Sequence, residues 1–361
     1  MGIKELIDER KIPALLVMNS GEAVTTPEQF EKRKAEIRHI LSEREYGVIP
    51  PRPDHMSVEI VKEDKSCCRS TAVMRTLKIT CEIGDDAFSF PAHSIIPKRE
   101  GKHPAFVSLN FYPEVPNKYQ PIEEIIDRGY ALFTVCYTGV TTDDNDFTNN
   151  AAPILCPSRR RNNSSSKVAM WAWAAMRMMD YVDTLPEIDK DNVAVIGHSR
   201  LGKTALVAGG FDERFKYVIS NESGCAGAAI SRGKVGEDIP TISRVFPFWF
   251  CPWYNSHAGE SEKFDFDQHF LLALTVPRHL LVGSAILDQW ADPTSEFLGL
   301  AAVNEAYNLY GMRGLVHEDK VPAPTTWLGE GDSCYFIRED AHYLSRHDWN
   351  AYMDFIDKYV K

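Results

Sequence analysis

The residue of this chain best placed for covalent chemistry is a serine between a strand-like and a helix-like segment. Residues 193–196 form a short apolar run typical of a buried strand, and residues 203–206 favour a helix. Ser199 falls on the tight turn expected between them, where its hydroxyl would be exposed above a sheet. An activated serine in this position can attack a carbonyl carbon and form an acyl-enzyme. The sequence therefore predicts acyl transfer, with an ordinary strand-to-helix turn as the alternative.

The glycines around this serine indicate the fold that would hold it. The nucleophile elbow of the α/β-hydrolases has the pattern G-x-S-x-G. Gly197 fits this pattern, whereas Leu201 occupies the second glycine position and Gly202 follows one residue later. We expect an α/β-hydrolase fold, which is a three-layer α/β/α sandwich with a mostly parallel central sheet.

Candidate partners for the serine lie farther along the chain. A serine hydroxyl needs a base within hydrogen-bond reach, and in this fold the chain order is serine, acid, histidine. His342 and His347 both lie late in the sequence, close to a predicted closing helix. Glu222 and Asp288 each follow a predicted strand, and either carboxylate could orient the imidazole. Asp292 fits a helix cap or a turn better than a catalytic role.

The motif around the serine resembles a known family. Residues 197–203 resemble the G-C/H-S-R-x-G-K signature of the glucuronoyl esterases, serine carbohydrate esterases that cleave the ester between glucuronic acid on xylan and an alcohol of lignin. Further segments agree with that family over roughly residues 100–361: 211–229, 267–269, 291–293 and 338–342. Residues 46–53 also resemble the N-terminal part of acetyl xylan esterase-like hydrolases.

The resemblance implies roles for the catalytic residues. It places the base at His342, just before a short loop and the Asp-Trp pair that opens the last helix. It aligns Glu222 with the family acid, so we favour Glu222, with Asp288 as a second contributor. The backbone N–H of Arg200 is placed by the fold to hold the oxyanion, and the resemblance adds its side chain. The alternative for the Arg200 side chain is a structural salt bridge under the elbow.

The same comparison suggests residues that bind the substrate. Lys203 lies four residues after Ser199 and so on the same helix face, and the resemblance implies that it contacts sugar hydroxyls. Trp290 matches a family tryptophan that packs near the uronate. Trp249 belongs to an aromatic-rich stretch that could wall the pocket or pack in the core, and His269 is either pocket-lining or structural. An aromatic platform beside a few polar donors is a reasonable sugar site.

Composition narrows the class of protein. The 361 residues are 44% hydrophobic and 25% charged, as in an ordinary soluble globular protein. The net charge of −11 argues against nucleic acid or an anionic membrane as a partner. The eight cysteines lack C-x-x-C spacing, and the first residues do not read as a signal peptide. We expect a cytoplasmic protein with reduced thiols, or a secreted one if a signal was removed.

Patterning also predicts the order of elements. We expect one α/β-hydrolase domain over residues 1–361, with an N-terminal helical arm at about 1–55 and an aromatic-rich insertion at about 231–266 over the carboxyl edge of the sheet. A capping box at Thr26–Gln29 predicts a helix that runs to about Glu45. Strands are predicted at 69–83, 87–96, 105–110 and 130–137, near 219, and at 280–285, and helices at 171–185 and 348–360.

These observations favour an esterase that uses no metal or organic cofactor. The first hypothesis is cleavage of a glucuronate ester, because a large hydroxyl-bearing acyl group needs Lys203 and Trp290. The second is deacetylation of xylo-oligosaccharides, for which neither residue is needed. The third is a binding protein of hydrolase fold without turnover. The segments 143–146 and 112–116 depart from secreted members of the family and leave the ester itself open.

Overall fold

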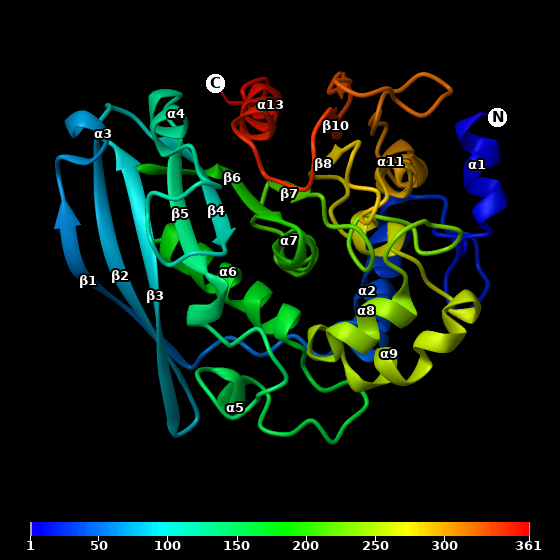
Figure 1. Cartoon of the computed structure of the whole chain (residues 1–361), viewed down its shortest axis with the longest axis horizontal. Helices are drawn as coiled ribbons and strands as arrows, with labels where there is room; N and C mark the ends of the chain where they lie inside the picture. Colours follow the sequence, from blue (N-terminus) through cyan, green and yellow to red (C-terminus); the bar gives the residue numbers. More distant parts are fainter. Residues whose placement is uncertain (1, 361) are drawn as a thin grey trace.

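A single mixed sheet forms the centre of the computed structural model, which describes residues 2–360. Its ten strands lie in the order β1-β2-β3-β5-β4-β6-β7-β8-β10-β9 (Figure 1). The six strands from β5 to β10 in that order run parallel. Antiparallel pairs join β1 to β2, β2 to β3, β3 to β5 and β9 to β10. The strands are β1 (His55–Asp64), β2 (Ala72–Ile83), β3 (Asp86–Pro97), β4 (His103–Asn110), β5 (Ala131–Cys136), β6 (Ile188–His198), β7 (Tyr217–Asn221), β8 (His279–Ala285), β9 (Trp327–Leu328) and β10 (Cys334–Arg338).

Helices cover both faces of this sheet. The larger apolar core joins one face to α2 (Pro27–Arg44), α6 (Lys167–Val182), α7 (Arg200–Phe211) and α11 (Pro293–Ala302). A second core joins the other face to α4 (Ile122–Asp127) and α13 (Arg346–Ile356). The remaining helices are α1 (Ile3–Arg10), α3 (Cys67–Ser70), α5 (Ala152–Leu155), α8 (Ile239–Val245), α9 (Pro252–His257), α10 (His269–Ala273) and α12 (Asn304–Leu309). This is the expected three-layer α/β-hydrolase architecture.

The apolar runs identified in the sequence form the middle of the sheet. Strands β4, β5, β7 and β8 are buried along their whole length, because parallel strands are covered by helices on both faces. The helix predicted from the capping box is α2, with Thr26 as N-cap and Gln29 closing the box. Helix α6 begins at Lys167, earlier than expected, because Ser166 caps it.

Other elements differ from the prediction at the periphery. The strand expected from residue 69 begins at Ala72, since residues 67–70 form the short helix α3, in which Cys68 and Arg69 have left-handed backbone angles. Strand β1 was not predicted: it is a mostly exposed edge strand, in which only Met56, Val58 and Ile60 alternate with polar residues. The segment 231–266 contains α8, α9 and two 3₁₀ turns. No described helix combines the length and the apolar character needed to cross a bilayer.

Candidate active site

Ser199 occupies a strained turn between β6 and α7. Its φ of 57° and ψ of −127° lie in a region that residues with a side chain rarely adopt. A Cβ on Gly197 would lie 1.9 Å from the carbonyl oxygen of Leu201, and one on Gly202 would lie 3.0 Å from Cβ of Ser223. On the helix side of Ser199, the position where a side chain would meet a neighbouring segment is therefore 202. This explains why Leu201 can replace the second glycine of the usual pattern.

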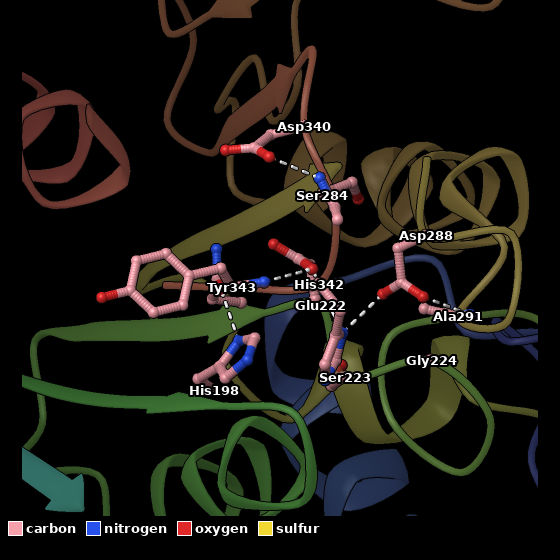
Figure 2. Close-up of polar contacts among 12 residues, drawn as sticks. His198, Glu222, Ser223, Gly224, Ser284, Asp288, Ala291, Asp340, His342 and Tyr343 are labelled. Carbon is pink, nitrogen blue, oxygen red and sulfur yellow. Dashed lines mark hydrogen bonds and ion pairs between the residues drawn. The ribbon is translucent and has the colours of Figure 1, made fainter. Parts of the chain in front are cut away.

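His342 lies beside two carboxylates that come from neighbouring strand ends. Its Nδ1 is 2.6 Å from Oδ2 of Asp288 and 3.1 Å from Oε2 of Glu222 (Figure 2). Glu222 follows β7, Asp288 follows β8 and His342 follows β10, so the carboxyl ends of three adjacent parallel strands bring them together. The sequence favoured Glu222 over Asp288, whereas the structure places both at one nitrogen with Asp288 nearer.

The difference arises because Glu222 has other partners. Its carboxylate accepts hydrogen bonds from Nη2 of Arg338 and, at 3.1 Å, from the backbone N–H of Tyr343. Burial raises the pKa of Glu222 to about 7 despite these bonds and the one to His342. Burial also raises the pKa of Asp288, but the hydrogen bond and charge of His342 outweigh burial and leave that pKa below its usual value. Asp288 is therefore the carboxylate that stays ionised at neutral pH.

The imidazole responds to both acids. Burial lowers the pKa of His342, but hydrogen bonds to Asp288 and Glu222 outweigh burial and raise the pKa to about 9. The arrangement thus stabilises the imidazolium. With Nδ1 directed at the carboxylates, Nε2 is the ring nitrogen left to exchange a proton with a hydroxyl.

A cavity of about 330 Å³ opens beside Ser199 and His342. Three side chains predicted to bind substrate, Lys203, Trp249 and Trp290, line it together with both acids and Arg200. Phe246, the first residue of the aromatic-rich stretch that could wall the pocket, also lines it. The sequence reasoning missed four further lining residues, which are Ser223, Gly224, Glu237 and Ala291. Glu237 lies in a loop without regular periodicity, so no pattern in the sequence marked it.

Known proteins resemble this chain over nearly its whole length. A family model for the fungal glucuronyl esterases matches residues 79–311. A carbohydrate esterase from an unknown prokaryotic organism is 31% identical, with 97% of this chain and 89% of the relative covered. The chain belongs to the glucuronoyl esterase family. It is accordingly a carboxylic ester hydrolase.

Two further comparisons support the assignment of this esterase. The solved glucuronoyl esterase from Solibacter usitatus is 31% identical, covers 96% of this chain and 97% of its own, and superposes with a TM-score of 0.88. A 4-O-methyl-glucuronoyl methylesterase from Neurospora crassa is 29% identical over 84% of this chain and 73% of its own length. Both the family and the α/β-hydrolase fold predicted from the sequence are confirmed.

The two cations of the esterase cavity are held in different ways. Lys203 is 4% exposed and donates from Nζ to the carbonyl oxygen of Ser223, and its burial lowers the pKa of the ammonium. Arg200 pairs through Nη1 with Oδ2 of Asp143, as in the structural alternative for this residue. Arg200 also lines the cavity, and within residues 2–360 its buried Nε has no hydrogen-bond partner. The salt bridge and a contact with the reacting ester are therefore compatible.

A second histidine packs against the ring of His342. The ring of His198 lies 4.4 Å from that of His342, and its Nδ1 is 2.7 Å from Oδ1 of Asn221. Burial and the neighbouring His342 lower the pKa of His198 to about 3, so it is neutral. The sequence reasoning missed this contact, although His198 stands directly before the serine. His347, the rival base, is exposed on α13.

Two other predictions are settled by placement. His269 does not line this cavity: its side chain is buried on α10, with Nε2 2.9 Å from the carbonyl oxygen of Pro13. Its assignment as a substrate contact is corrected to the structural alternative. Asp292 caps α11 by accepting from the backbone N–H of Ser295, as predicted.

The acid–histidine cluster could also accommodate a metal ion by geometry. Ligand atoms of Glu222, Asp288 and His342 all lie within 4.8 Å of one another. A metal ion at Nδ1 would have to displace a proton that the raised pKa of His342 holds firmly. The cluster is therefore better suited to holding a proton at neutral pH.

Proposed function

We propose that this esterase hydrolyses esters of glucuronic acid, with Ser199 as nucleophile and His342 as base. The observation that carries the proposal is the cavity beside Ser199, which combines Lys203, Glu237 and the exposed face of Trp290. An ammonium donor, a carboxylate acceptor and an apolar ring are the groups that recognise a sugar with several hydroxyls. An acetyl group would use none of them.

The reaction proceeds in two balanced steps. Nε2 of His342 takes the proton of Ser199 as Oγ bonds to the ester carbon, and the same proton passes to the departing alcohol as the C–O bond breaks. Water, activated by His342, then cleaves the acyl-enzyme to release the uronic acid and restore Ser199. Asp288 is the principal partner of the imidazolium, and Glu222 is the second.

Charge on the carbonyl oxygen develops next to the start of α7. Arg200 offers two donors at this place. Its backbone N–H lies at the N-terminus of α7, and its buried side-chain Nε has no protein partner among the described residues. We assign the oxyanion contact to these groups. Lys203 and Glu237 hold sugar hydroxyls, and Trp249 and Trp290 wall the acyl pocket.

Paired assays test this function. We expect hydrolysis of a methyl or benzyl glucuronate ester, abolished by Ser199→Ala and retained in Ser89→Ala, which alters an exposed serine on β3. An acetylated xylo-oligosaccharide should be cleaved poorly. Cleavage of the acetylated substrate alone, still dependent on Ser199, would replace the uronate assignment with the acetyl esterase. If neither substrate is cleaved and a serine-directed phosphonate probe does not react either, the result would favour a binding protein.

A further inference from the structure

One carboxylate outside the cavity joins three side chains that come from separate elements. Asp143 lies in the loop after β5 and is largely buried, with 14% of its side chain exposed. Its Oδ2 pairs with Nη1 of Arg200 and accepts from the hydroxyl of Tyr137 at 3.0 Å. Its Oδ1 accepts from Nε1 of Trp249 at 2.8 Å. Both oxygens of Asp143 are thus used by groups that surround the reacting centre.

Arg200 is held on a second side by an aromatic face. Its guanidinium carbon lies 4.7 Å from the centroid of the Trp249 ring. Phe246 stacks on the same tryptophan, with ring centroids 3.9 Å apart and an interplanar angle of 4°. Arg200, Trp249 and Phe246 all line the cavity, whereas Asp143 does not. Apart from the field of its charge, any effect of Asp143 on the reaction must therefore pass through these neighbours.

The hydrogen bonds leave a buried donor of Arg200 without a partner among the described residues. Nη1 is occupied by Asp143, while Nε is buried with no partner in the part of the chain that the structure describes. A buried donor without a partner is costly, and in a residue that lines a cavity a ligand can complete the bond. Without Asp143, the long arginine side chain would regain rotamer freedom, and the guanidinium would occupy this position beside the cavity for only part of the time.

We propose that Asp143 is a positioning residue of the esterase. It fixes the Arg200 guanidinium for the oxyanion and, through the same carboxylate, fixes the Trp249 wall of the acyl pocket. Stabilisation of the transition state and the shape of the acyl pocket thereby depend on one side chain that touches neither the ester nor Ser199. This inference rests on the proposed role of Arg200.

A double-mutant cycle between Asp143→Asn and Arg200→Gln tests the proposal. Removing one donor to the oxyanion typically costs about 10²–10³ in kcat, so misplacing it in Asp143→Asn should cost roughly 10–100-fold, with little change in KM. In the Arg200→Gln background the same substitution should cause no further loss of kcat, because there is no guanidinium left to position and the amide oxygen of Asn can still accept the bond from Trp249. Asp144→Asn, in the same loop and exposed, is the matched control and should behave as wild type.

The outcomes separate positioning from a structural role. Additive losses in the double variant, a loss confined to KM, or an undiminished kcat would each overturn the proposal. So would a faster Asp143→Asn enzyme, since removal of a negative charge would by itself favour an oxyanion. Melting curves of every variant report folding. If Asp143→Asn does not fold, Trp249→Phe removes one bond to the carboxylate. This variant should raise KM, because Trp249 walls the acyl pocket, and its smaller loss of kcat should be absent in the Arg200→Gln background.

Failure of this inference is distinguishable from failure of the proposed function. The cycle is measured with the benzyl glucuronate ester and with 4-nitrophenyl acetate, whose acyl group carries no sugar. Hydrolysis of the acetate alone would reject the uronate assignment, but the coupling between Asp143 and Arg200 could still be measured with that ester. A wild-type kcat in Arg200→Gln with either ester would remove the oxyanion role, and the positioning role with it.

Discussion

The two carboxylates at Nδ1 of His342 interact with the imidazole in different ways. Asp288 is closer to His342 and keeps a low pKa, whereas Glu222 is raised to about 7 by burial and shares its oxygens with Arg338. The ionised acid stabilises the imidazolium by charge, and the weaker acid contributes a hydrogen bond. This division predicts how activity depends on pH.

The activity of the wild-type enzyme should rise through alkaline pH. His342 acts as a base only when its imidazole is neutral. Because the pKa of His342 is about 9, this imidazole is mostly protonated in the free enzyme at pH 7. Replacing Asp288 by Asn removes the ion that favours the cation, so the rise in kcat/KM should move to lower pH. Because Glu222 remains, we expect a loss of only about 10–100-fold in kcat at the optimum, less than the ~10⁴ seen for a triad with a single acid.

Profiles of kcat/KM against pH for the wild type, Asp288→Asn and Glu222→Gln check this prediction. Glu222→Gln should shift the rise in the same direction by a smaller amount. A rise that stays at the same pH in both variants would mean that the carboxylates do not set the pKa of His342. A larger shift in Glu222→Gln would restore the order that the sequence suggested.

At the scale of elements, the turn between β6 and α7 brings the end of the strand into van der Waals contact with the first turn of the helix. Gly197 allows the chain to fold back on the first turn of α7. A Cβ there would meet the backbone of Leu201, which cannot move without displacing the helix. The geometry of Ser199 therefore depends on a residue with no side chain.

Substitution of Gly197 by Ala should damage both stability and catalysis. Overpacking of this kind costs about 1–3 kcal/mol, and the displaced turn should lower kcat more than KM. Gly259→Ala is the matched control, because a Cβ at Gly259 meets nothing within 4 Å. Denaturant unfolding and steady-state kinetics of the two variants provide the comparison. A Gly197→Ala enzyme as stable as Gly259→Ala would contradict the packing argument.

The elements of the middle of the sheet could be predicted from the sequence, and the edges could not. Apolar runs marked β4, β5 and β8 because burial on both faces demands them. Strand β1 was missed because Met56, Val58 and Ile60 give only a short alternation on an exposed edge that is otherwise largely polar and charged. Among site residues, Ser199 and His342 stand in local motifs. Glu237 reaches the cavity, and Asp143 reaches Arg200, only through the path of long loops, which no local pattern encodes.

At the scale of the whole molecule, a buried carboxyl ties the ends of two central strands together. Glu296 on α11 accepts from the backbone N–H of Gly224 at 2.9 Å and from the hydroxyl of Ser284 at 2.6 Å. Burial raises the pKa of Glu296 to about 8, above the ordinary value of 4.5. The folded protein thus binds this proton more tightly than the unfolded chain does, and the stability of the fold depends on pH.

The sign of that dependence follows from linkage. Between about pH 4.5 and 8 the folded state holds the proton of Glu296 and the unfolded chain does not, so this residue's contribution to stability falls as pH rises. Gln cannot ionise, so the stability of Glu296→Gln relative to the wild type should improve steadily from pH 5 to pH 8. Urea unfolding at several pH values measures the difference. A constant difference would show that Glu296 does not ionise differently in the two states.

The pair of acids at His342 also bears on how such a protein can change over evolution. A single substitution can remove either Glu222 or Asp288 and still leave a carboxylate at the same nitrogen. The acid of the triad can therefore migrate from the end of one strand to the end of the next through active intermediates. Descendants of such a chain could keep either acid alone, so the position of the acid is a poor guide to whether two of these enzymes share a mechanism.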